Sequence, residues 1–82
     1  MKKTFYCVNA EFYDNGKRLA CVTISNNEVR SQHRKVPGME AFKLCFALED
    51  SAREFADFIN NGKMGINAAL WLFHQYDGVQ VA

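Results

Sequence analysis

Two stretches near the N-terminus alternate between apolar and polar residues. Residues 4–13 and residues 18–25 each place apolar side chains at every second position, which is the two-residue period of a half-buried strand. The four residues between them, Asp-Asn-Gly-Lys, are typical of a tight turn. The sequence therefore predicts an antiparallel hairpin over residues 4–25.

The apolar pattern also predicts the length of the turn. A two-residue loop at residues 15–16 would direct the apolar side chains of the two strands to opposite faces of the hairpin. A three-residue loop at residues 14–16 pairs Ala10 with Ala20 and brings both apolar sets to one face. We therefore expect a type I turn followed by Gly16 in the left-handed conformation of a bulge.

Residues 42–62 combine two periods. Apolar and polar residues alternate over residues 42–48, as in a strand, and an apolar face with helical spacing follows in residues 51–61. This change of period predicts a third strand followed by a helix over residues 51–61. The alternative is one continuous amphipathic helix over residues 39–61, because this stretch contains no proline and no glycine until Gly62.

Both ends of the helix predicted over residues 51–61 carry capping signals. Ser51 precedes Glu54 by three residues, which is the spacing of a capping box. Asn61 and Gly62 follow the last apolar position, and a glycine there favours a left-handed stop.

The run Ala68–Tyr76 is apolar on nearly every side and predicts a second helix, with Asn67 as its N-cap. A buried strand is the alternative for such a short apolar run. Residues 79–81 fit either a short final strand or a frayed tail.

Residues 26–41 are polar and basic and predict a connecting loop. Pro37 and Gly38 mark a turn near its end. A short edge strand around residues 29–31 is an alternative for part of this segment.

These elements predict a single α+β domain over residues 1–82, with the order β-β-β-α-α. The helix at 51–61 packs on one face of a three-stranded antiparallel sheet, because a hairpin alone is not stable. An apolar content of 49% with one proline and five glycines is typical of an ordered domain. The alternation places Cys7, Cys21 and Cys45 together on the opposite face of the sheet.

The three cysteines cannot all pair within the chain, and none forms a CxxC motif. The first residues also lack the uninterrupted apolar run of a secretory signal. We therefore expect reduced thiols and a cytoplasmic protein. A zinc site built from the three thiolates and His33 or His74 is an alternative, but isolated cysteines favour a role as small apolar residues. No metal and no other cofactor is expected.

Length and charge exclude a few functional classes. No apolar run reaches the roughly 18 residues that a membrane span requires, so we expect no membrane contact. The net charge is +1, but residues 1–38 hold seven basic and three acidic residues, whereas residues 39–82 hold three and six. This asymmetry predicts a dipolar surface.

No motif indicates catalysis, since the sequence contains no phosphate-binding loop, no dinucleotide fingerprint and no metalloprotease signature. We expect a non-enzymatic module that binds another macromolecule, most simply a protein, and that forms a homodimer if its surplus apolar surface self-associates. The alternative is nucleic-acid binding through the basic residues 30–35 and the aromatic residues of the hairpin. The candidate partner-binding residues are Arg30, His33, Arg34, Lys35, Tyr13, Trp71 and Tyr76.

Two segments, VNAEFYDNGKRLA and FALEDSAREF, together resemble a pattern found in small bacterial and phage proteins, though not in one named family. The resemblance implies no activity. It favours an origin in a phage or another mobile element, and with it a role as an inhibitor or modulator of a host complex.

Overall fold

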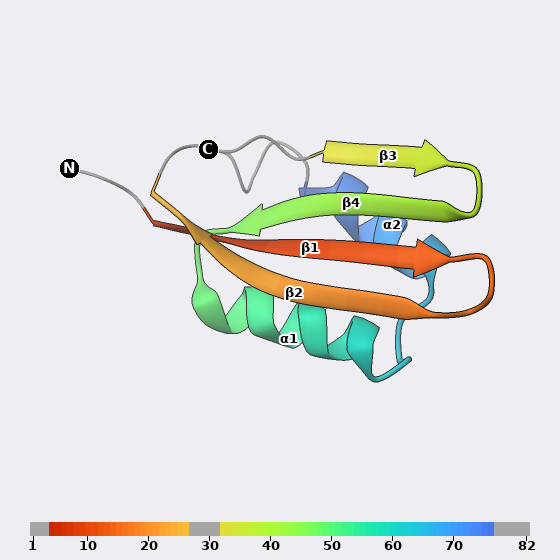
Figure 1. The fold of residues 1–82 in the computed structure, drawn as a ribbon. Helices are drawn as coiled ribbons and strands as arrows, with labels where there is room; N and C mark the ends of the chain where they lie inside the picture. Colours follow the sequence, from red (N-terminus) through yellow and green to blue (C-terminus); the bar gives the residue numbers. More distant parts are fainter. Residues whose placement is uncertain (1–3, 27–31, 77–82) are drawn as a thin grey trace.

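The computed structural model describes residues 4–26 and 32–76. In this part of the chain the elements follow the order β1 (Phe5–Tyr13), β2 (Arg18–Ser25), β3 (Gln32–Val36), β4 (Met39–Phe46), α1 (Glu49–Asn60) and α2 (Ile66–Tyr76). The strands form one antiparallel sheet in the order β2-β1-β4-β3. Both helices lie on the same side of this sheet (Figure 1), so the fold is α+β with one helical layer.

The β1–β2 hairpin has the predicted register. Ala10 pairs with Ala20 across the strands, and the Tyr13 amide donates to the Lys17 carbonyl at 2.8 Å. The Gly16 amide closes the turn by donating to the Tyr13 carbonyl at 3.0 Å, and the φ of Gly16 is +90°. The three-residue loop with a left-handed glycine is therefore confirmed.

The prediction of a three-stranded sheet is wrong, because β3 forms a second hairpin with β4. The predicted loop at 26–41 contains this strand and the first residues of β4. Only Pro37 and Gly38 separate the two strands, and Gly38 has a φ of +85°, as position i+2 of a type II turn requires. All five residues of β3 are exposed, so it shows none of the apolar alternation that reveals a half-buried strand.

Residues 42–61 form a strand followed by a helix, as predicted, although the bounds differ. No continuous helix over residues 39–61 forms. The predicted capping box is wrong, since α1 begins at Glu49 and Leu48 occupies the N-cap without a side-chain hydrogen bond. Ser51 therefore lies inside the first turn. Glu49 and Asp50 supply negative charge there, which the helix dipole favours.

The predicted left-handed stop of α1 is confirmed, with Gly62 at a φ of +71°. Gly62 donates its amide to the Ile59 carbonyl at 3.1 Å, and Lys63 donates to the Phe58 carbonyl at 2.9 Å. These two bonds define a Schellman motif, which satisfies carbonyls that the helix end would leave unpaired.

The main core lies between the sheet and the helical layer. Phe55 of α1 packs its ring against Phe42 and Phe46 of β4, with centroid separations of 6.0 and 5.6 Å. The other residues buried around them come from alternate sheet positions and from one face of α1, and include Val8, Leu44, Ala52, Ala56 and Ile59. The inward positions predicted for β4 are thus correct through Phe46, whereas Leu48 has left the sheet and is 68% exposed. Ile24 of β2, predicted to face the core as well, is 64% exposed.

Helix α2 also packs against this core, through Ala69 and, in part, through Ile66 and Leu70. It begins at Ile66, and the Ala69 amide donates to the Gly65 carbonyl at 2.9 Å, so the predicted Asn67 cap is wrong. The helical prediction is confirmed over the strand alternative. The alternatives for residues 29–31 and 79–81 lie outside the described residues.

Candidate functional site

The sheet face opposite the helices is covered by neither described helix (Figure 1). Its side chains form cross-strand rows that run β2-β1-β4-β3. One row consists of Leu19, Glu11, Ala41 and Arg34, and the next consists of Cys21, Asn9, Lys43 and Gln32. We call these eight residues the open face.

A hollow of about 370 Å³ lies over these two rows. Its lining combines apolar, uncharged polar and charged side chains, which include Leu19, Cys21, Gln32, Glu11, Arg34 and Lys43. The short side chain of Ala41 lies between Glu11 and Arg34 in one row, which leaves room between the longer neighbours. Leu19 is 51% exposed at one rim. We call this concavity the sheet hollow.

The carboxylate of the sheet hollow is already engaged. The Tyr13 hydroxyl donates to Glu11 Oε1 at 3.0 Å. This hydrogen bond, with smaller contributions from desolvation and from the negative charge of Glu11, raises the pKa of Tyr13 above its ordinary value. Glu11 is therefore oriented along β1 towards the turn end of the strand.

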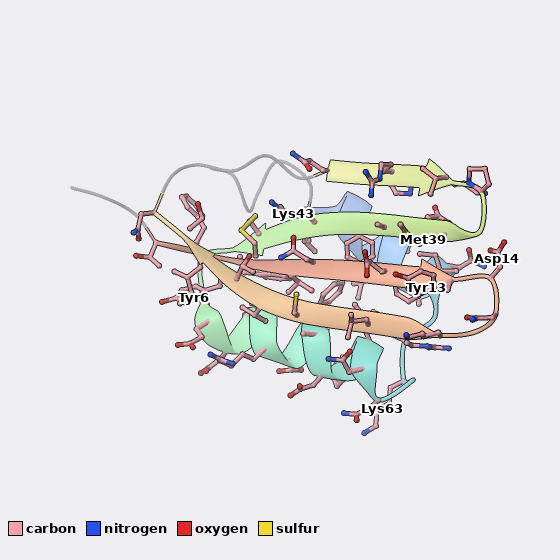
Figure 2. All side chains as sticks on the ribbon, viewed as in Figure 1. Tyr6, Tyr13, Asp14, Met39, Lys43 and Lys63 are labelled. Carbon is pink, nitrogen blue, oxygen red and sulfur yellow. A yellow bond between two sulfur atoms is a disulfide. The ribbon has the colours of Figure 1, made fainter. Side chains whose placement is uncertain are left out.

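The two cations of the sheet hollow have no carboxylate partner among residues 4–26 and 32–76. The carboxylates found there in contact with basic side chains are Glu40, which His33 contacts, and Glu49, which pairs with Arg53, each at 2.7 Å. Lys43 lies on the central strand β4 (Figure 2) and is half-buried, whereas Arg34 lies on the edge strand β3 and is exposed. With Glu11 as the one carboxylate among its described lining residues, the sheet hollow carries a net positive charge.

At one end of the same sheet face, Cys7 and Cys45 form a disulfide between the two central strands (Figure 2). The two residues are directly opposite each other, with Cα atoms 3.9 Å apart, and both are buried beside Phe5. Cys21 is free and exposed. The three cysteines share one face, as predicted, but the expectation of three reduced thiols is wrong.

The disulfide changes two hypotheses that rested on free thiols. Cys7 and Cys45 are not available as thiolates for zinc, and in the described part of the chain no group of three or more potential ligands is placed to hold a metal. The cytoplasmic location was inferred from reduced thiols, so it stays a prediction without structural support. Among the described residues, no helix is long and apolar enough to cross a membrane.

The candidate partner-binding residues do not form one cluster. Tyr13 and Arg34 lie on the exposed side of the sheet, but His33 and Lys35 point to the helical side, because successive residues of β3 alternate between faces. His33 Nε2 contacts Glu40 Oε2 there. Trp71 lies on α2 and is 62% exposed. Arg30 and the side chain of Tyr76 lie outside the described residues.

The sequence hypothesis did not include Lys43, Gln32 or Leu19 among the candidate residues. The alternation of residues 42–48 does predict that Lys43 faces away from the core. Its placement between Asn9 and Gln32, however, requires β3 to pair with β4. The hollow was not predicted because the strand that completes it was not predicted.

Comparisons of this chain with models of protein families, with curated proteins and with solved structures find no match.

Proposed function

We propose that this protein is a non-enzymatic module that binds another protein through its open face. The observation that supports this function is the sheet hollow, which combines an exposed leucine with two cations that have no described counter-ion. Arginine is enriched at protein-binding surfaces, and exposed apolar surface such as that of Leu19 marks such sites. A role as inhibitor of a host complex would be one form of this function.

Nucleic-acid binding through the basic segment is the weaker alternative. Bases on an open sheet stack against exposed aromatic rings. Of the hairpin aromatics, Phe5 is buried and Tyr6 packs against the main core, which leaves Tyr13 at the turn end of the face. The alternation of β3 also divides the basic segment between the two faces of the sheet.

Self-association is a separate proposal, since it would use the helical side. Phe5 and Leu70 contribute little exposed apolar surface, because Phe5 is buried and Leu70 packs against the main core. Phe58 and Trp71 remain exposed, and they supply the apolar surface on which a homodimer would depend. Light scattering of the purified protein over a range of concentrations tests this proposal, which a monomer at all concentrations would contradict.

Affinity capture with the full chain as bait tests the proposed function, with one matched pair of variants. Leu19 and Leu48 are both exposed leucines, but Leu19 lies on the open face and Leu48 precedes α1. We expect Leu19→Asp to lose the captured protein and Leu48→Asp to retain it, because only the first places a charge in the contact.

The capture is repeated after nuclease treatment and at raised salt. A protein partner should survive nuclease treatment, and its binding should weaken with salt less steeply than a contact through several phosphates. Loss of the partner on nuclease treatment, or equal capture by both aspartate variants, would contradict the proposed function.

A further inference from the structure

We propose that the sheet hollow receives an acidic, amphipathic segment of the partner protein, with its carboxylates at Arg34 and Lys43 and an apolar side chain on Leu19. This inference rests on the proposed function and names the chemistry of the partner. It follows from the charge of the hollow, from its shape and from the contacts that its side chains already make.

The charge of the hollow points to a ligand that carries carboxylates. Arg34 and Lys43 come from neighbouring strands, and neither makes an ion pair with a residue that the structure describes. Glu11 is the carboxylate on the lining, and the hydroxyl of Tyr13 donates to it. An incoming carboxylate would therefore meet two cations and one carboxylate, so the charge of the lining remains net positive.

The arrangement of the rows indicates how such a segment lies. Arg34 and Lys43 lie on adjacent rows at the β3–β4 side, whereas Leu19 and Cys21 lie on the same two rows at the β2 side. A segment placed across the strands would therefore meet cations at one end and apolar or weakly polar groups at the other. Gln32, beside Lys43, adds an amide that can donate to a carboxylate.

A nucleic acid fits the same hollow less well. Its phosphates would match the two cations, but the hollow has no aromatic side chain on which a base could stack, since Phe42 faces the core. Leu19 would also remain without an apolar partner. These features favour an acidic peptide, and a nucleic acid becomes one outcome of the test.

The test follows the backbone amides of the ¹⁵N-labelled full chain by NMR while a probe is added at low salt. The probe is a synthetic peptide in which glutamate alternates with valine, and the matched control peptide has glutamine in place of glutamate. We expect the glutamate peptide to shift the amides of the open face, including those of Asn9, Gln32 and Ala41. The glutamine peptide should bind more weakly.

Three alanine variants assign the effect to the hollow. Arg34→Ala and Lys43→Ala should each weaken binding of the glutamate peptide by about two- to fivefold, as expected for a solvent-accessible ion pair. Lys63→Ala removes the same charge from the turn after α1, below β2 in Figure 2 and away from β3 and β4, and should leave binding unchanged. Equal losses for Lys43→Ala and Lys63→Ala would overturn the inference, because they would indicate a general charge effect.

Two further outcomes would also overturn it: glutamine and glutamate peptides that bind equally, or an oligothymidine that binds the open face more tightly than the glutamate peptide. One result would contradict this inference and still support the proposed function. A partner that is lost with Leu19→Asp but captured undiminished by the Arg34→Ala/Lys43→Ala double variant would support protein binding while excluding an acidic segment.

Discussion

Reduction of the disulfide is the perturbation with the largest expected effect on this fold. Cys7 and Cys45 lie on the two central strands and are separated by 38 residues in sequence. In the loop-entropy account, opening a loop of that size increases the conformational entropy of the unfolded chain. This lowers the free energy of unfolding by about 4 kcal/mol at 25 °C. For a domain of this length, such a loss lowers the melting temperature by roughly 15–30 °C.

Denaturation in urea, followed by far-ultraviolet circular dichroism with and without dithiothreitol, measures this loss. The Cys21→Ser background removes the free thiol and prevents exchange between cysteines. The Cys7→Ala/Cys45→Ala variant is the control, because the reductant should not change its unfolding midpoint. In parallel, a thiol-reactive reagent added to the unfolded, non-reduced wild type should modify Cys21 alone.

Two results would refute the reasoning. If all three cysteines of the unfolded, non-reduced protein react, the bond between the central strands does not exist. If the bond exists but reduction shifts the free energy of unfolding by less than about 1 kcal/mol, loop closure contributes little here.

Three other predictions test individual contacts. The side chain of Asn60 accepts a hydrogen bond from the Ala20 amide on β2 and donates one to the Ala20 carbonyl, both at 2.8 Å. Asn60→Ala should therefore lower the free energy of unfolding, measured in urea, by about 1–3 kcal/mol. Asn60→Asp should not restore this loss, since a carboxylate cannot donate to the β2 carbonyl. Gly62→Ala should lower stability by about 1–2 kcal/mol in thermal unfolding because its φ is +71°, whereas Gly65→Ala, in open space without a positive φ, should cost less. Glu11→Gln should lower the pKa of Tyr13 towards its ordinary value in an ultraviolet titration of tyrosinate. Because the folded-state pKa is the raised one, any stability from this contact is present at neutral pH and is lost in the alkaline range.

The β1–β2 hairpin could be predicted in detail because burial of one face constrains its register. A shift by one residue would move Val8 and Ala10 out of the core, and the turn length follows from that demand. The same reasoning identified the core face of β4. The local capping signals predicted the first residue of each helix less accurately. Ser51 has the spacing of a capping box, yet α1 begins two residues earlier, where the chain leaves the sheet.

Strand β3 could not be predicted from periodicity, because periodicity reports burial and all five of its residues are exposed. Its backbone pairing with β4 defines it as a strand, and such pairing does not require a particular pattern of side chains. Prediction of the disulfide likewise required knowledge of which strands pair. The sequence placed three cysteines on one face, but the pairing of Cys7 with Cys45 requires β4 to lie beside β1 in a particular register.

These same contacts determine how firmly each part of the open face is held. β4 pairs with strands on both sides, its Phe42 and Phe46 pack against Phe55, and the disulfide joins it to β1, so Lys43 lies on a well-supported strand. Arg34 lies on an edge strand that pairs with β4 alone.

Two polar contacts stabilise the β3 side of the sheet. The His33–Glu40 pair joins β3 to β4 on the helical side, and the Asp14 amide donates to the Gly38 carbonyl at 3.1 Å, which joins the two hairpin turns. Because both contacts lie away from the hollow, they can hold β3 in place without neutralising its charge. Arg34 and Lys43 can therefore keep their relative positions while both remain available to a partner, which is the preorganisation that a binding face requires.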